Sequence, residues 1–335
     1  MIVIGDPRQA LHAPLRELNN GEWTPYAEVP ARYASIVEAV GSIATPQDRG
    51  LDPILAVHDA EYVAFLREAH TRWRADGREG DALGYAFPVV RRRKLALTRI
   101  DAALGAHSMD TATPVAAETW GSAYWSAQSA INAVDAVAES ARHAFALCRP
   151  PGHHAGADYM GGYCYLNNAA IAARRAEARG LGPVAILDVD YHHGNGTQDI
   201  FYEDAGVLFC SLHADPRTDF PYYWGHADET GAGAGEGATR NVPLGRGTTW
   251  ADYEAALGPV LERIALWGAR SLIVSFGADT FVGDPISSFA LETADYLPMG
   301  RMIGTLGLPT VIVMEGGYDL PSLGRNVASF LSGFA

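Results

Sequence analysis

The chain has 335 residues, of which 48% are hydrophobic, and it carries 25 Lys and Arg residues against 39 Asp and Glu residues, a net charge of −14. This size and composition fit a folded α/β protein and exclude a globally disordered chain. The acidic balance argues against nucleic acids and anionic membranes as partners.

The cysteines and the N-terminus indicate the compartment. Cys148, Cys164 and Cys210 are odd in number and form no C-x-x-C motif, so we expect no disulfide framework and a reducing, cytoplasmic environment. The first residues, MIVIGDPRQA, lack the basic and long apolar segments of a signal peptide. We also expect no membrane-spanning segment.

Short apolar runs rich in β-branched residues predict strands that are buried on both faces. In chain order they lie at 1–5, 143–147, 184–190, 207–213, 271–277 and 310–317. Helical patterns lie at about 59–74, 121–140, 166–180, 251–267, 294–306 and 321–333. This alternation favours a doubly wound α/β structure in a single domain, 1–335. Two long irregular stretches, about 75–119 and 214–248, are typical of functional or flexible loops.

Polar side chains follow five of the six predicted strands. The segments are RPPGHHAG (149–156), DVDYHHGNG (188–196), SLH (211–213), GADTF (277–281) and EGGY (315–318). In open α/β sheets, ligands bind outside the carboxyl ends of the strands. We therefore expect these five segments to form one site.

Asp190, His192 and Asp279 are candidate metal ligands. Asp190 and His192 are separated by one residue, so both side chains can point to one side just past a strand. One imidazole and two carboxylates suit Zn²⁺ or Fe²⁺ and leave an open position for water or substrate. An isolated D-x-H motif is more often explained as a helix cap than as a pair of metal ligands. The presence of Asp279 and of the other histidines favours the interpretation as a metal site.

The second histidine pair, His153 and His154, is a candidate for acid–base chemistry near neutral pH, although both residues could also bind metal. A histidine base needs a partner on its other ring nitrogen, and Asp188 and Asn195 are candidates for that role. One charged and one neutral partner would give the two imidazoles different basicities. Tyr318 can donate a hydrogen bond to a developing oxyanion.

Together these segments resemble the zinc-dependent histone deacetylase superfamily, in the same order and at similar spacing. The stretches GGYCYLNNAA (161–170) and DPIS (284–287) and the long 75–119 loop are most similar to its bacterial acetylpolyamine amidohydrolase branch. The resemblance implies the arginase–deacetylase fold, an α/β structure whose central parallel sheet has eight strands and helices on both faces. It also implies a metal-dependent amidohydrolase that deacetylates acetylated amines, with acetylpolyamines as the leading substrates and acetyl-lysine peptides as the alternative.

The resemblance also implies residue roles. Asp190, His192 and Asp279 match the zinc ligands, and His153 and His154 match the catalytic histidines, with Asp188 beside His153 and Asn195 beside His154. His154 would be the general base, and Tyr318 would polarise the substrate carbonyl. The implied substrate-binding residues are Tyr163, Phe220, Asp110, Gly162 and Gly316. Structural potassium would bind Asp188, Asp190, His192, Ser211 and Leu212, with a second site near Phe201, Asp204 and Val207.

The long loop carries the expectations about substrate and assembly. The polyamine branch holds the distal substrate amine with an acidic loop residue, for which Asp110 is the first candidate and Glu118 the second. By the same resemblance, the loop narrows the active-site entrance at a homodimer interface.

Three other functions fit parts of the pattern less well. An arginase-like ureohydrolase would need a second carboxylate near Asp279, where the chain has Gly277. A non-catalytic binding protein usually loses the base or the tyrosine, and both are present. A serine hydrolase is disfavoured because no G-x-S-x-G occurs, and nothing marks Cys148 as an activated nucleophile.

Overall fold

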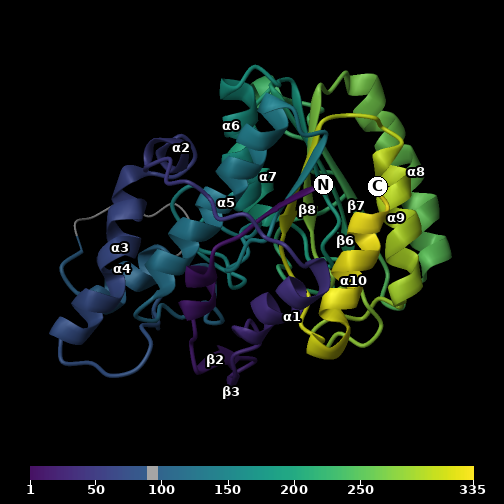
Figure 1. Cartoon of the computed structure of the whole chain (residues 1–335). Coiled ribbons are helices and arrows are strands. Elements are labelled where there is room, and N and C mark those ends of the chain that lie inside the picture. The colour runs from purple at the N-terminus through teal and green to yellow at the C-terminus, as the bar shows by residue number, and fades with distance from the viewer. Residues whose placement is uncertain (89–96) are drawn as a thin grey trace.

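The computed structural model describes residues 1–88 and 97–335. Its centre is a seven-stranded parallel sheet with the order β1-β4-β9-β8-β5-β6-β7 (Figure 1). The strands are β1 (Ile2–Ile4), β4 (His143–Ala146), β5 (Val184–Asp188), β6 (Val207–Ala214), β7 (Thr239–Leu244), β8 (Ser271–Phe276) and β9 (Thr310–Met314). A separate antiparallel hairpin pairs β2 (Arg16–Asn19) with β3 (Glu22–Pro25).

Helices cover both faces of the sheet (Figure 1). One face packs against α5 (Thr119–Glu139) and α6 (Asn168–Ala178), beyond which lie α2 (Asp52–Leu55), α3 (Ala60–Ala75) and α4 (Ile100–Ala106). The other face packs against α1 (Ala31–Val40), α8 (Trp250–Trp267), α9 (Tyr296–Gly304) and α10 (Leu320–Ser332). The short helix α7 (Asn195–Phe201) follows β5.

The strand cores alternate between two hydrophobic clusters. On β5, Ile186 packs into the cluster with α5 and α6, while Ala185 and Leu187 pack into the cluster with α8 and α10. Every residue of β5, β6, β8 and β9 is buried. The continuous apolar runs therefore predicted these strands correctly, because a sheet covered on both faces leaves no polar side to alternate.

The predicted number of strands was wrong for the residues that the structure describes, which contain seven strands in the main sheet rather than eight. One of the seven, β7, lies within 214–248, which we expected to be irregular throughout. It contains Pro243, which obscured the strand pattern. Proline has no amide hydrogen to donate, so strands tolerate it mainly at a sheet edge, where β7 lies.

Helices α1 and α7 were not predicted, and α4 lies inside the stretch 75–119 that we expected to be irregular. The sequence of α7, NGTQDIF, begins with residues of low helix propensity. This helix is stabilised by tertiary contacts instead: Asn195 and Thr197 are buried, and the Thr197 amide donates to the His153 carbonyl oxygen at 3.1 Å. In the described part of the chain, no helix has both the length and the apolar character that crossing a bilayer requires.

Candidate active site

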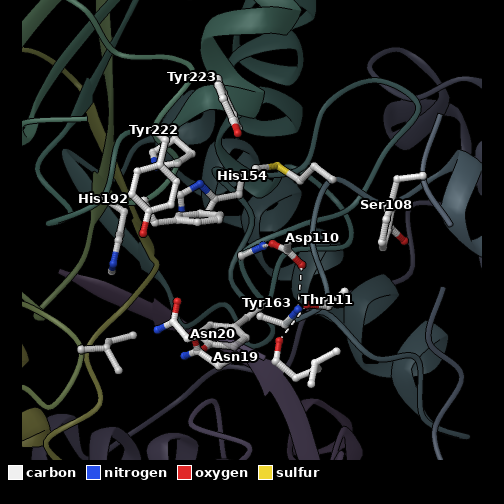
Figure 2. A pocket seen from close by; sticks show the side chains of 18 of the residues that line it. Asn19, Asn20, Ser108, Asp110, Thr111, His154, Tyr163, His192, Tyr222 and Tyr223 are labelled. Carbon is white, nitrogen blue, oxygen red and sulfur yellow. Dashed lines mark hydrogen bonds between the residues drawn. The ribbon is translucent and has the colours of Figure 1, made fainter. Parts of the chain in front are cut away.

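The polar segments that follow the strands meet at the carboxyl edge of the sheet, beside a cavity of about 590 Å³. His154 follows β4, His192 follows β5 and Tyr318 follows β9, and all three line the cavity (Figure 2). Asp190 and Asp279 lie behind them and are fully buried. Parallel strands point the same way, so segments that are far apart in sequence end at one place.

Asp190, His192 and Asp279 form a compact cluster in which one donor atom from each residue lies within 4.8 Å of the others. His192 Nδ1 is 3.1 Å from Asp279 Oδ2 and 3.3 Å from Asp190 Oδ1. Burial and the neighbouring Asp190 raise the pKa of Asp279 to about 7. Burial lowers the pKa of His192, but its hydrogen bonds to Asp190 and Asp279 outweigh burial and raise that pKa to about 10.

This donor set fits a divalent cation. Two buried carboxylates concentrate negative charge, and they share an opening with an imidazole nitrogen, which matches the ligand preference of Zn²⁺ or Fe²⁺. Backbone amides hold the carboxylates in place: His192 N donates to Asp190 Oδ1 at 2.8 Å, Gly316 N to Asp190 Oδ2 at 2.9 Å and Tyr191 N to Asp279 Oδ1 at 3.0 Å. The two carboxylates are therefore held in position by the backbone around them.

Glycine is required at position 316 because the carboxylates of Asp190 and Asp279 lie against its backbone. A Cβ atom at position 316 would lie 2.5 Å from Asp279 Oδ2 and 2.7 Å from Asp190 Oδ2, so no larger residue fits beside the carboxylates. Gly162 is required for a second reason. It has φ of +52°, and a Cβ atom there would lie 2.1 Å from His154 Cδ2. We predicted both as substrate-site residues, and the structure places both against the cluster or the histidine pair.

The two histidines of the pair have different partners. His153 Nδ1 is 3.0 Å from Asp188 Oδ2, and His154 Nδ1 is 2.7 Å from Asn195 Oδ1. Burial lowers the pKa of His153, but Asp190 and Asp188 outweigh it and raise that pKa to about 10. Burial and the neighbouring His153 and His192 hold the pKa of His154 well below its usual range. His153 is therefore a cation and His154 a neutral base at neutral pH.

Tyr318 is held by a buried arginine that sequence analysis did not find. Arg32 Nε donates to the Gly317 carbonyl oxygen and its Nη2 donates to the Glu315 carbonyl oxygen, both at 2.6 Å. Its guanidinium carbon lies 4.8 Å from the centre of the Tyr318 ring. A third contact, at 2.8 Å, pairs Arg32 with Glu28, which neutralises the buried charge. No sequence motif marks Arg32, because only the fold brings α1 beside the turn after β9.

Glu315 begins the EGGY segment, but sequence analysis gave it no role. Its Oε2 accepts hydrogen bonds from the backbone amides of Gly152 at 2.6 Å and His153 at 3.1 Å, and Ser275 Oγ donates to its Oε1 at 3.1 Å. This buried carboxylate therefore ties the histidine loop to the end of β9. Burial raises the pKa of Glu315 to about 7.

Tyr163 and Phe220 line the cavity on different loops, as we expected for channel walls. The Tyr163 ring lies 5.6 Å from the Tyr318 ring, and the Phe220 ring lies 5.0 Å from the His154 ring. The Tyr163 hydroxyl donates to Glu17 Oε1 at 3.1 Å, a partner on β2 that sequence analysis missed. Burial raises the pKa of Glu17 to about 7.

Asp110 also lines the cavity, whereas the exposed Glu118 lies at the start of α5 and is not among the lining residues. Asp110 Oδ2 accepts from the Gly162 amide at 2.6 Å (Figure 2). Its Oδ1 accepts from the Ala112 amide at 3.0 Å and from Thr113 Oγ1 at 2.9 Å. The central part of the predicted 75–119 loop, residues 89–96, lies outside the described residues.

Of the residues that we expected to bind potassium, Asp188, Ser211 and Leu212 lie on the paired strands β5 and β6, and Asp190 and His192 follow β5. Asp188 is in register with Ser211, and Leu212 follows directly on β6. Around the second expected site, the Asp204 amide donates to the Phe201 carbonyl oxygen at 3.0 Å, and the Asp204 carboxylate pairs with Arg174 at 2.6 Å. Val207 begins β6 close by.

His193 packs beneath the site. It is buried, its Nε2 lies 3.0 Å from Gln198 Oε1 and 3.2 Å from Asn241 Oδ1, and its ring is 4.5 Å from the His213 ring. Both contacting oxygens are acceptors, so Nε2 carries the proton. The three cysteines are free and buried, as expected from their number and spacing.

A parallel sheet with an oriented histidine pair and a carboxylate–imidazole cluster at its carboxyl edge places this chain among the α/β enzymes. Within that class, the histone deacetylase domain matches residues 26–334, and the chain belongs to this family. It is 48% identical to acetylpolyamine amidohydrolase 2 of Pseudomonas aeruginosa, over 100% of this chain and 98% of that protein. It is 47% identical to the acetylpolyamine amidohydrolase of Mycoplana ramosa, over the full length of both.

A solved structure supports the fold. The acetylpolyamine aminohydrolase of Burkholderia pseudomallei superimposes with a TM-score of 0.96 at 41% sequence identity, covering 100% of this chain and 98% of that one. The predicted family and its α/β fold are thereby confirmed.

Proposed function

We propose that this protein is a metal-dependent amidohydrolase that removes acetyl groups from acetylated amines, above all acetylpolyamines, and releases acetate and the free amine. One observation carries the proposal. A neutral histidine, His154, lies 5.9 Å ring to ring from His192 of the carboxylate–imidazole cluster and faces the same cavity. The full-length relatives named for acetylpolyamine hydrolysis support the choice of substrate class.

Asp190, His192 and Asp279 would hold the catalytic cation, Zn²⁺ by preference, with Fe²⁺ as the alternative. When bound, such an ion polarises the acetamide carbonyl and lowers the pKa of a neighbouring water. His154, whose Nδ1 is engaged by Asn195, uses its free Nε2 to take the proton from the attacking water. Tyr318 donates a hydrogen bond from its hydroxyl group to the oxyanion that develops as water adds.

His153, whose Nδ1 lies 3.0 Å from Asp188 Oδ2 and whose Nε2 lies 3.7 Å from Asp190 Oδ1, would remain protonated and would stabilise negative charge near Asp190. His154 then returns its proton to the nitrogen of the leaving amine as the carbon–nitrogen bond breaks. Tyr163 and Phe220 would enclose the linear part of the substrate, with Asp110, Gly162 and Gly316 around it.

The decisive experiment measures acetate release by the zinc-loaded protein. We expect kcat/KM to be larger for acetylputrescine, acetylcadaverine and acetylspermidine than for an acetyl-lysine peptide. Faster turnover of the peptide would overturn the polyamine preference and favour a protein deacetylase. No acetate from any of the four, with metal bound, would favour a non-catalytic binding protein, and two metal ions per chain would favour an arginase-like enzyme.

We also propose that potassium binds at Asp188, Asp190, His192, Ser211 and Leu212, and that the protein acts in the cytoplasm as a single-domain homodimer with residues 75–119 at the active-site entrance and the interface. Light scattering should then give twice the chain mass of 35.8 kDa. A monomeric mass at micromolar concentration would contradict the dimer and leave the chemistry of the site untouched.

A further inference from the structure

Three non-glycine residues have a left-handed backbone among the residues that the structure describes: Asn20 (φ 51°), Tyr163 (φ 66°) and Tyr222 (φ 64°). All three line the same cavity. Bulky side chains rarely adopt this conformation, and where they do, the surroundings impose it, often where a ligand binds.

The left-handed conformation of two of these residues follows from their local setting. Asn20 precedes Gly21 in the hairpin turn between β2 and β3, where Asn commonly takes a left-handed conformation. Tyr163 is a buried channel wall that Glu17 fixes through its hydroxyl. Tyr222 differs from both, because it is neither a usual turn residue nor part of the core.

The backbone of Tyr222 is fixed on both sides while its side chain remains available. Its amide donates to the Asp219 carbonyl oxygen at 3.2 Å, and its own carbonyl oxygen lies 3.2 Å from His226 Nε2. The side chain is 49% exposed, and its ring lies edge-on to Phe220 at 6.4 Å. Because the Phe220 ring in turn lies 5.0 Å from the His154 ring, a chain of ring contacts connects Tyr222 to the proposed base.

The expected partner of a substrate ammonium, Asp110, is already engaged. Asp110 is the only carboxylate that the described residues contribute to the cavity lining. Its two oxygens accept three hydrogen bonds, from Gly162 N, Ala112 N and Thr113 Oγ1. These bonds hold Gly162 against His154, so the carboxylate braces the channel wall.

We infer that Tyr222 determines substrate specificity: its ring face binds the distal ammonium of an acetylated diamine or polyamine, while Asp110 positions Gly162 and Tyr163. The inference rests on the proposed deacetylase function. An alkylammonium is attracted to the face of an aromatic ring by the ring quadrupole. A ring at the cavity mouth, in line with Phe220, meets the end of the substrate that lies farthest from the acetamide.

Two substrates of equal length separate recognition of the terminal charge from binding and hydrolysis of the rest of the substrate. Acetylputrescine ends in an ammonium, and N-pentylacetamide ends in a methyl group at the same position. The measurement is the ratio of their kcat/KM values on the metal-loaded protein. We expect Tyr222→Leu to lower this ratio by roughly two- to thirty-fold, the range of a cation–π contact, with a smaller change for the neutral substrate.

Three variants serve as controls. Tyr222→Phe keeps the ring and should restore most of the ratio. Trp23→Leu removes another exposed aromatic ring, one outside both the cavity lining and residues 75–119, and should leave the ratio unchanged. Asp110→Asn should lower kcat/KM for both substrates by the same factor. The substitution weakens the hydrogen bonds that position Gly162 and removes no contact with the substrate ammonium.

An unchanged ratio in Tyr222→Leu overturns the inference, and so does a loss in Tyr222→Phe that equals the loss in Tyr222→Leu. If Asp110→Asn lowered kcat/KM for acetylputrescine alone, Asp110 would be the residue that binds the ammonium, and the inference about Tyr222 would also be overturned. Failure of the proposed function looks different, since the unaltered protein would then release no acetate from either substrate.

Discussion

Single atoms decide the chemistry of the histidine pair. Asp188 and Asn195 contact equivalent ring nitrogens of adjacent histidines, yet one partner is a carboxylate and the other an amide oxygen. Asp190 and the carboxylate of Asp188 together outweigh burial and raise the pKa of His153, whereas burial and two neighbouring imidazoles lower the pKa of His154, whose amide partner is neutral. The proposed division of labour between a stabilising cation and a base therefore depends on Asp190 as well as on the difference between Asp188 and Asn195.

This division can be tested with Asn195→Asp. A carboxylate at the position of the amide, 2.7 Å from His154 Nδ1, favours the imidazolium and raises the pKa of His154. The acid limb of the kcat/KM profile should move to higher pH, because only neutral His154 accepts a proton. A pH profile at constant metal content measures the shift, and an unmoved limb would show that another group is the base.

Tyr318 should contribute to catalysis through its hydroxyl alone. Tyr318→Phe keeps the ring against Arg32 and Tyr163 but removes the proposed oxyanion donor. Loss of one such donor typically costs about 2.7–4 kcal/mol, so kcat should fall by roughly two to three orders of magnitude. Single-turnover assays measure the loss, with metal content and Tm unchanged as the control. Full activity would remove Tyr318 from the proposed mechanism.

At the scale of elements, the hairpin β2–β3 connects the N-terminal region to the channel wall. Glu17 on β2 is buried and accepts a hydrogen bond from Tyr163, while its second carboxylate oxygen, Oε2, has no hydrogen-bond partner among the described residues. An unpaired buried carboxylate is costly when ionised, which explains why its pKa is raised to about 7. The hairpin therefore makes the stability of the fold depend on pH.

The sign of this dependence follows from the raised pKa. Folding favours protonated Glu17, so its contribution to stability is present below the ordinary carboxyl pKa and is lost as pH rises through about 7. Glu17→Gln keeps an oxygen for the Tyr163 hydroxyl and cannot ionise. We expect the variant to gain stability relative to the unaltered protein between pH 5 and pH 8, by about 1 kcal/mol after allowance for solvent screening. Thermal unfolding at both pH values measures this, and equal Tm differences would contradict it.

Element prediction succeeded where burial is uniform and failed where tertiary contacts override local preference. The runs that became β5, β6 and β9 are apolar throughout, since helices cover both faces of the sheet. β7 was hidden by Pro243, and α7 by its weak helix formers. Both elements form because β6 and the histidine loop supply the hydrogen bonds that their own sequences do not favour.

For the whole molecule, a bound cation should be part of the folding free energy. An ion present at about 100 times its Kd contributes about 2.7 kcal/mol. At about 2.1 cal/mol/K of unfolding entropy per residue, 1 kcal/mol shifts the Tm of this 335-residue chain by about 1.4 °C. A chelator should therefore abolish activity and lower Tm by about 4 °C, and Zn²⁺ should restore both. Asp279→Asn removes one ligand, so its Tm should respond far less. A full response in that variant would refute Asp279 as a ligand.

The sequence by itself determined which residues come together. The strand-end segments predicted that Asp190, His192, Asp279, the histidine pair and Tyr318 lie in one site, because parallel strands end at a common edge. Only the tertiary structure decided which contacts hold those residues and which side chains lie at the mouth of the cavity. Arg32, Glu315 and Glu17 make contacts across the fold, and a contact between distant segments leaves no local pattern in the chain.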